Sequence, residues 1–124
     1  MIGTPVRIAL LTAAALLSKA AVADVDRGGD VFDEACSECH SVAKPLKNKK
    51  GPGLLGVVGR KAATVPDFHY SEALSASGIV WTPEEIDTYL RAPKARVPGG
   101  KMKFDGLDKA SERRDLIEFL DTQR

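Results

Sequence analysis

The two cysteines of this 124-residue sequence stand three positions apart in the segment Cys36-Ser37-Glu38-Cys39-His40, where one of the two histidines follows them at once. Two thiols at this spacing can each form a thioether bond with a vinyl group of one haem. The adjacent imidazole can then bind the haem iron. We therefore interpret this segment as a site of covalent haem attachment.

Three other uses of a Cys-x-x-Cys pair compete with this interpretation. A thioredoxin-like dithiol belongs in a βαβ unit, and no strand pattern flanks the pair. A zinc site would need two further ligands, whereas His69 is the one remaining histidine and there is no third cysteine. A disulfide would close a very small loop and would leave His40 without a role. Haem attachment is favoured, with a redox dithiol as the main alternative.

A second iron ligand is predicted at Met102, the one methionine besides Met1, in the loop Pro98-Gly99-Gly100-Lys101-Met102-Lys103-Phe104. A thioether between two lysines is poorly explained as core packing. As an axial ligand opposite His40 it would raise the reduction potential of a haem used for electron transfer. The rival is His69, which would give a bis-histidine haem of lower potential, although its setting favours an exposed or hydrogen-bonded imidazole near the haem edge.

An iron without a second protein ligand would have an open site and could act on peroxide or bind a gas. That alternative is a haem enzyme or a ligand sensor, and the sequence supplies no distal acid–base pair for such chemistry. We expect an electron carrier without catalytic residues.

The first 23 residues have the pattern of a secretory signal peptide. Arg7 precedes an apolar run over residues 8–17, and Ala21-Val22-Ala23 resembles a cleavage site of the A-x-A type. Polar residues at positions 18 and 19 make the run too short for a membrane anchor. We expect cleavage after Ala23, export to the periplasm, and one domain over residues 24–124 without stable membrane insertion.

Helix start and stop signals divide this domain into helices and a long irregular loop. The apolar spacing from Asp26 to Cys39 predicts a first helix that ends at the cysteine motif. Residues 42–63 lack a helical period and are rich in glycine, so they predict an irregular loop whose backbone approaches the cofactor closely. Thr82-Pro83-Glu84-Glu85 has the cap, the proline and the glutamate of a helix start, and Ala92-Pro93 ends that helix after Arg91.

A last helix is predicted with Asp108 or Ser111 as its N-terminal cap. It carries an apolar stripe formed by Leu116, Ile117, Phe119 and Leu120. No stretch has a strand pattern, so the predicted class is all-α.

These features together resemble a class I c-type cytochrome of the mitochondrial cytochrome c and bacterial cytochrome c2 kind. The similarity extends from Gly28 and Phe32 through the cysteine motif to Leu116 and Phe119, and it needs no insertion. The resemblance implies a small cytochrome c fold, in which helices and irregular loops wrap around one covalently bound haem c. It also implies that the first helix crosses the last, with Gly28 and Phe32 packing on Leu116 and Phe119.

The resemblance also assigns a haem pocket. The Pro52 carbonyl should accept a hydrogen bond from the other ring nitrogen of His40, which fixes the ring orientation. Tyr89 should lie near Met102. The other positions that the resemblance assigns to the propionates or to the haem edge are Arg60, Tyr70, Ser71, Trp81 and Phe104. Phe68, Leu74 and Gly100 replace polar residues that are usual in the family, which leaves the potential open.

Charge is unevenly distributed along the chain. Two of the 18 basic residues, Arg7 and Lys19, lie in the predicted signal peptide, so the mature chain has 16 basic and 17 acidic residues. Residues 41–61 and 88–104 nevertheless contain basic residues and no acid. Such runs are often a solvated face. Here they predict a positive rim around the haem edge that docks on acidic faces of membrane redox complexes, such as cytochrome bc1, an oxidase or a photosynthetic reaction centre.

The charge also bears on other partners. A periplasmic chain without net positive charge is a poor binder of nucleic acid. Because a docking carrier needs its haem edge free, we expect a monomer.

Overall fold

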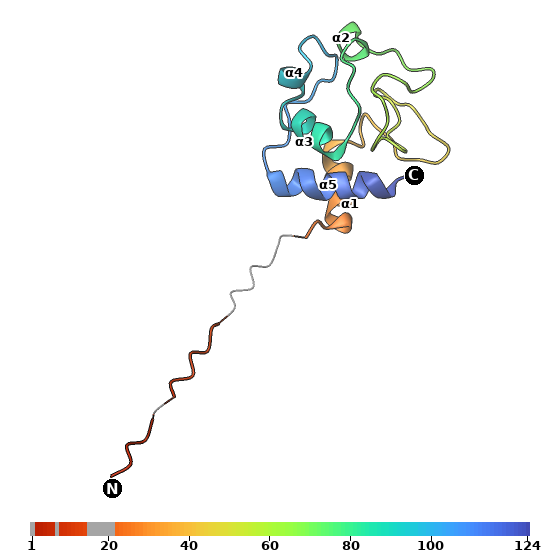
Figure 1. Cartoon of the computed structure of the whole chain (residues 1–124). Helices are drawn as coiled ribbons and strands as arrows, with labels where there is room; N and C mark the ends of the chain where they lie inside the picture. The colour runs from red at the N-terminus through yellow and green to blue at the C-terminus, as the bar shows by residue number, and fades with distance from the viewer. Residues whose placement is uncertain (1, 7, 15–21) are drawn as a thin grey trace.

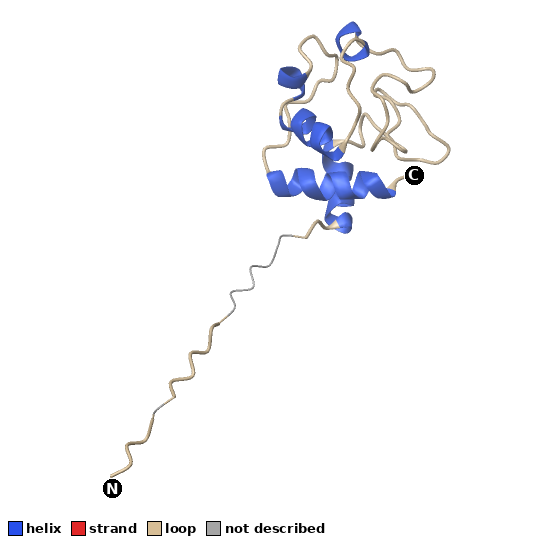
Figure 2. Ribbon diagram, viewed as in Figure 1, coloured by secondary structure: helices blue, strands red, loops and turns tan. Residues whose placement is uncertain are grey.

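The computed structural model describes residues 2–6, 8–14 and 22–124. Within them the helices follow in the order α1 (Val25–Ala35), α2 (Glu72–Ser75), α3 (Pro83–Arg91), α4 (Pro93–Arg96) and α5 (Ala110–Thr122). Long irregular loops connect the helices (Figure 1), and this part of the chain shows no strand beyond one isolated bridge between Lys61 and Val80 (Figure 2). The predicted all-α class is confirmed.

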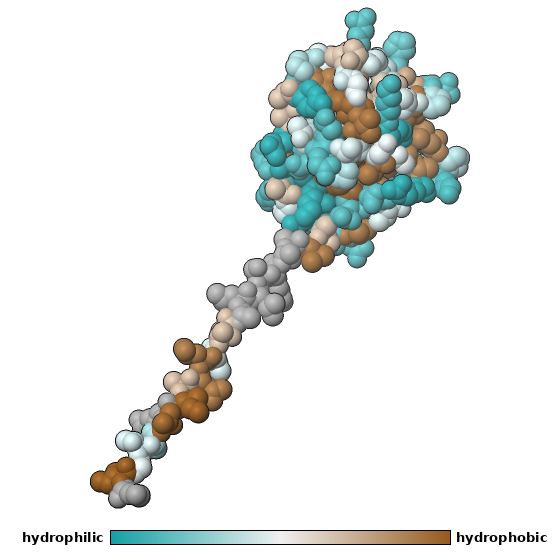
Figure 3. Space-filling view, viewed as in Figure 1, coloured by the Kyte–Doolittle hydropathy of each residue, from teal (hydrophilic) through white to brown (hydrophobic). Residues whose placement is uncertain are grey.

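The predicted signal peptide, Met1–Ala23, lies partly outside the described residues, because residues 1, 7 and 15–21 are not among them. Ile8, Leu10 and Leu11 of its apolar run are 81–96% exposed, and Figure 3 shows apolar surface concentrated along this segment. In the described part of the chain, no helix has both the length and the apolar character needed to cross a membrane. Cleavage after Ala23 stays a prediction.

The two longest helices, α1 and α5, cross at the lower edge of the domain as drawn in Figure 1. A Cβ atom on Gly28 of α1 would overlap the backbone of Asp115 and the side chain of Phe119 in α5. Phe32 lies 5.6 Å from Phe119 between ring centroids, in a tilted arrangement, and Leu116 is fully buried in the same cluster. The predicted packing of the first helix on the last is therefore confirmed.

The first helix is shorter than its periodicity predicts. It ends at Ala35, and the backbone N–H of Cys36 closes it by donating to Phe32 O. Cys36 itself has non-helical backbone angles, and a turn follows in which Cys39 N and His40 N both donate to Cys36 O. The helix therefore ends at the cysteine motif, as predicted, but its apolar spacing continues to Cys39 although the cysteines occupy a turn.

The third helix begins and ends where its signals place it. The Thr82 hydroxyl accepts a hydrogen bond from Glu85 N at 3.2 Å, Pro83 occupies the first turn, and the helix ends at Arg91. Beyond extended Ala92, however, Pro93 opens the short α4 instead of a loop. The short α2 was also missed, although Ser71 caps it by accepting from Leu74 N at 3.1 Å.

The last helix starts without the cap that its sequence suggests. Lys109 occupies the cap position and makes no side-chain capping bond, so the expectation for Asp108 or Ser111 was wrong. The buried guanidinium of Arg113 stabilises this end instead. It donates to Leu107 O at 2.7 Å, to Asp108 O at 2.9 Å and to the Asp87 carboxylate at 2.8 Å. These bonds fix the segment before the helix to α3, and they satisfy carbonyl groups, not the N–H groups that a cap would bind.

The helix crossing yields a matched test. We expect Gly28→Ala to destabilise the haem-loaded protein by about 2 kcal/mol or more, because its methyl group must force α1 and α5 apart. Gly29→Ala is the control, since its Cβ would lie 3.4 Å from Phe119 Cε2, in ordinary contact. The control should change stability by less than about 1 kcal/mol and gain helix propensity. Guanidinium unfolding measures both, and equal losses would contradict this account of the crossing.

Candidate haem site

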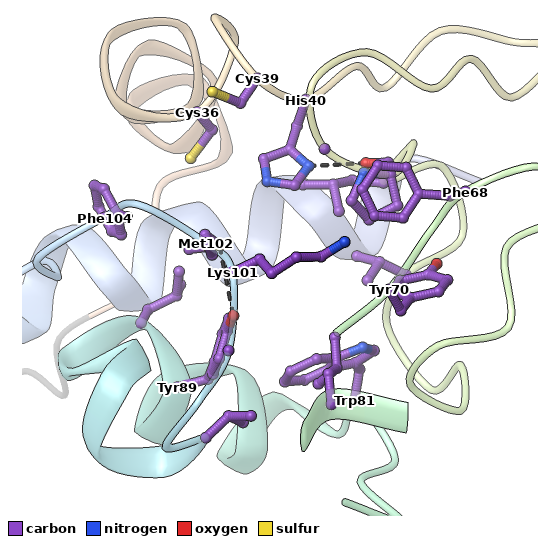
Figure 4. A pocket seen from close by; sticks show the side chains of 18 of the residues that line it. Cys36, Cys39, His40, Phe68, Tyr70, Trp81, Tyr89, Lys101, Met102 and Phe104 are labelled. Atoms are coloured by element: carbon purple, nitrogen blue, oxygen red, sulfur yellow. Dashed lines mark hydrogen bonds between the residues drawn. The ribbon is translucent and has the colours of Figure 1, made fainter. Parts of the chain in front are cut away.

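A cavity of about 610 Å³ lies in the interior of the domain, enclosed by α3, α5 and the long loops. Its size is within the range of cofactor sites. All of the pocket residues expected from the sequence line it, namely Cys36, Cys39, His40, Pro52, Arg60, Tyr70, Ser71, Trp81, Tyr89, Met102 and Phe104. Figure 4 shows most of them converging on one space. Residues far apart in the sequence, such as Cys36 and Phe104, thus meet at one site.

Apolar side chains that the sequence did not assign to the site form much of the remaining wall. They are Leu54, Val57, Leu74, Ile86, Leu90, Val97, Leu116 and Leu120. Helical spacing marks Ile86 and Leu90 of α3 and Leu116 and Leu120 of α5 as core, but no local signal separates a core that surrounds a cofactor from one that is filled by side chains. The cavity is therefore a product of the fold.

His40 is held in one orientation. Its Nδ1 lies 2.8 Å from Pro52 O, and since a carbonyl oxygen can only accept, Nδ1 carries the hydrogen and Nε2 keeps its lone pair for a metal. Burial is the main cause that lowers the pKa of His40, so the ring stays neutral, as a ligand must be. The hydrogen bond to Pro52 is the one expected from the sequence.

Gly51 supports this orientation and was not predicted as a site residue. A Cβ at Gly51 would overlap the imidazole ring of His40. Its N–H donates to Cys39 O at 2.7 Å, which ties the glycine-rich loop to the cysteine turn. The predicted close approach of a glycine-rich loop was the available signal, but the sequence could not indicate which glycine faces the ring.

Cys36 and Cys39 are both free thiols on the wall of the cavity that also carries His40 (Figure 4). Burial raises the pKa of Cys36 to about 11, and the neighbouring Cys39 adds to the effect. Redox-active dithiols have the opposite property, a lowered thiol pKa that supplies the thiolate. The environment of the pair thus argues against the redox dithiol and fits addition to a cofactor.

Met102 is half-buried and reaches the cavity from the loop that follows α4. The hydroxyl of Tyr89 donates to its Sδ at 3.6 Å, and Tyr89 packs on Trp81 with ring centroids 5.0 Å apart. Burial raises the pKa of Tyr89, so the phenol remains a neutral donor. The thioether is therefore held from one side by a residue of α3.

His69, the rival ligand, lies at the rim of the cavity and its residue is exposed. Its backbone carbonyl accepts a hydrogen bond from Lys101 Nζ at 2.6 Å, which links the His69 loop to the methionine loop. The exposure agrees with the setting expected from the sequence. The half-buried thioether of Met102 is the better placed of the two candidates.

The polar residues expected near the propionates also hold the loops together. Arg60 donates to Leu55 O and Gly53 O, each at 2.9 Å, and burial lowers its pKa. The Tyr70 hydroxyl accepts from Val65 N at 3.1 Å, and Ser71 caps α2. Phe68 packs edge-on against Tyr70 at 4.9 Å. That these polar residues bind the propionates stays a prediction. The loop contacts give them a second role.

The donors and the walls of the cavity fit one haem. Two neutral thiols, an imidazole with a free Nε2 and a thioether share a cavity with mainly apolar walls. Thiols, imidazole and thioether are the groups by which proteins hold haem. We expect Cys36 and Cys39 to attach its periphery, with His40 and Met102 as the iron ligands.

Comparisons with known proteins identify similar chains. A family model described as Cytochrome c matches residues 25–124. Cytochrome c2 of Rhodomicrobium vannielii is 43% identical over 120 residues and covers 95% of both chains. Cytochrome c type-1 of Ascaris suum is 45% identical over 100 residues, which cover 81% of this chain and 88% of that protein.

A solved structure is similar as well. The structure of cytochrome cH from Methylobacterium extorquens superposes with a TM-score of 0.75 at 37% sequence identity, covering 80% of this chain and 98% of that one. The arrangement of helices and loops is thus shared with a chain of related sequence.

The Tyr89–Met102 contact can be tested by spectroscopy. Tyr89→Phe removes the donor to Sδ, so we expect a lower reduction potential, because the sulfur then donates more electron density to the iron. Thr88→Val is the control, since it removes a hydroxyl from the same helix, but that hydroxyl donates to Glu84 O outside the cavity lining. Redox titration of both variants measures the shift. A drop that is as large in Thr88→Val would contradict a specific effect on Met102.

Proposed function

Because this chain belongs to the cytochrome c family, we propose that it carries single electrons between redox partners of a respiratory or photosynthetic chain in the periplasm. Members of the family hold one covalent haem c and are electron carriers, not enzymes. The observation that carries the proposal is the meeting of Cys36, Cys39, His40 and Met102 in one apolar cavity. The signal-peptide pattern supports the location.

The bound haem would supply an iron that alternates between the ferrous and the ferric state. The residues of the chain set the conditions for that change. Pro52 O and Gly51 hold His40 in one tautomer and orientation, and Tyr89 restrains Met102. A thioether ligand and apolar walls both favour the reduced, less charged state and so raise the potential. Fixed ligands also keep the rearrangement between the two states small.

The basic rim proposed for docking is smaller than the sequence suggests, because several cations have partners. Arg91 pairs with Asp87 at 3.3 Å and Arg96 forms two bonds to Glu85 at 2.7 and 2.9 Å. Lys50 lies 3.2 Å from Glu38, although that pair is exposed and weak. Lys103, beside Phe104 at the cavity, is exposed and has no ion pair among the described residues. It is the most direct candidate for contact with an acidic partner.

Replacement of each proposed ligand tests the iron site. We expect Met102→Ala to abolish the weak sulfur-to-iron absorption band of the ferric protein in the far red and to lower the potential by on the order of 0.1 V or more. His69→Ala, the control, should keep both. Loss of the band in His69→Ala alone would contradict the assignment. Carbon monoxide binding to the native ferrous protein would instead favour a sensor or an enzyme.

Charge reversal tests the docking surface. Lys103→Glu should slow electron transfer to an isolated cytochrome bc1 complex or oxidase several-fold at low salt, because it removes attraction during encounter. Lys109→Glu is the control, since Lys109 is exposed at the start of α5, away from the cavity lining. The difference should shrink as salt shortens the screening length from about 30 Å at 0.01 M to about 8 Å at 0.15 M. Equal slowing in stopped-flow measurements would place the docking face elsewhere.

A further inference from the structure

The carboxylate of Asp115 is buried where α5 meets the start of α1, with its side chain 5% exposed. Its Oδ1 accepts a hydrogen bond from the backbone N–H of Asp24 at 2.9 Å. Within the described residues this is the one hydrogen bond that reaches the carboxylate. Two guanidinium groups stand farther away, with Arg114 Nη2 at 3.6 Å and the largely exposed Arg27 Nε at 3.8 Å.

A buried carboxylate with one neutral donor is poorly compensated. Transfer of a charge out of water is costly unless a counter-charge and hydrogen bonds replace the water. An amide N–H supplies one neutral hydrogen bond, and the guanidinium groups of Arg114 and Arg27 both stand beyond hydrogen-bond distance, with Arg27 mostly in solvent. Asp115 would therefore gain from a formal positive charge at the position of Asp24 N.

Asp24 N is also the atom that leader removal would release. Its residue begins the contacts of the domain, because the side chain caps α1 by accepting from Arg27 N at 3.1 Å and the carbonyl accepts from Gly28 N at 2.9 Å. Val22, two residues before it, is 82% exposed, and Ala23 between them is half-buried. A cut before Asp24 would leave every one of these contacts in place.

We propose that a leader peptidase cuts the Ala23–Asp24 bond during export, and that the new α-ammonium of Asp24 forms an ion pair with Asp115 that fastens α1 to α5. The cut is a hydrolysis that consumes one water. The oxygen goes to the carboxylate of Ala23, which departs with the leader, and Asp24 N becomes an amine that is protonated at neutral pH. The proposal depends on the export part of the proposed function and not on electron transfer.

One effect opposes this ion pair, because the positive end of the α1 dipole disfavours an ammonium group at the start of the helix. Two carboxylates offset it. Asp24 carries its own carboxylate, whose pKa is lowered first by the hydrogen bond from Arg27 N. Asp115 supplies the second in a buried position, where screening by water is weakest. A charged donor forms roughly twice as strong a hydrogen bond as a neutral one.

The consequence is that processing and stability are coupled. The contact lies one helical turn before Gly28, at the crossing that orders the domain. A chain that keeps its leader has the neutral bond, whereas the cut chain has the ion pair.

The first test is the mass of the holoprotein after export with its own leader. We expect Asp24 as the first residue, confirmed by N-terminal sequencing. Any other first residue, for example Ala21 after a cut behind Ala20, would overturn the proposal. Normal electron transfer by such a protein would still leave the proposed function in place, so the two can fail separately.

The second test is a double-mutant cycle on the holoprotein, prepared to begin either at Asp24 or with Val22-Ala23 retained. With Asp115 present, the two extra residues should lower the folding equilibrium constant about five- to tenfold, because the ammonium moves away from the carboxylate. In Asp115→Asn the extension should have little effect. Asp26→Asn is the control and should leave the full effect of the extension, since Asp26 is exposed.

Guanidinium unfolding measures all of these chains. If the extension lowers the folding equilibrium constant as much in Asp115→Asn as in the parent chain, the proposed ion pair is overturned. If Asp115→Asn fails to fold, the chemical reactivity of the α-amine of Asp24 is measured instead. In the native chain that begins at Asp24, acylation of this amine should be at least about tenfold slower than in the unfolded chain, and equal rates would overturn the proposal.

Discussion

The close approach of α1 to α5 is the constraint on which the rest of the structure depends. Gly28 permits it, because any side chain there would meet the backbone of Asp115. The contact sets the direction in which α1 ends, and hence the place of the turn that carries Cys36 and Cys39. On its inner side α5 contributes Leu116 and Leu120 to the cavity wall. One pair of helices thus positions both the attachment residues and part of the space that faces them.

Loops, and not helices, supply most of the polar groups around the cavity, so their rigidity must come from specific contacts. Arg60 binds two carbonyl groups of the glycine-rich loop, and Lys101 Nζ binds His69 O across the cavity rim. Arg113 holds the segment before α5 against Asp87 of α3. These charged side chains satisfy backbone carbonyls that no helix or sheet would satisfy. A domain with few helices is thereby ordered around its site.

The apolar residues form two clusters that meet at Trp81. The larger contains Phe32, Ile86 and Leu116, and the smaller contains Ile79 and Val97. Both border the cavity, which means that a small chain uses the cofactor as part of its core. The haem is in this sense structural as well as functional.

The sequence by itself determined the features that arise between near neighbours along the chain. The spacing of Cys36, Cys39 and His40 indicated the cofactor, and Thr82 with Pro83 located the start of α3, because both depend on a few adjacent residues. Met102 was indicated as the one methionine besides Met1, and the resemblance to a family extended the site to Pro52 and the helix crossing to Gly28.

Tertiary structure decided what depends on distant partners. The start of α5 without a cap, the contact of Gly51 with His40, and the pairing of Arg96 with Glu85 all depend on groups brought together by folding. The link from Asp24 N to Asp115 joins residues 91 positions apart. Local patterns do not encode such contacts, because a helix cap or a turn is specified within a few residues, whereas a tertiary contact is specified by the packing of the whole chain.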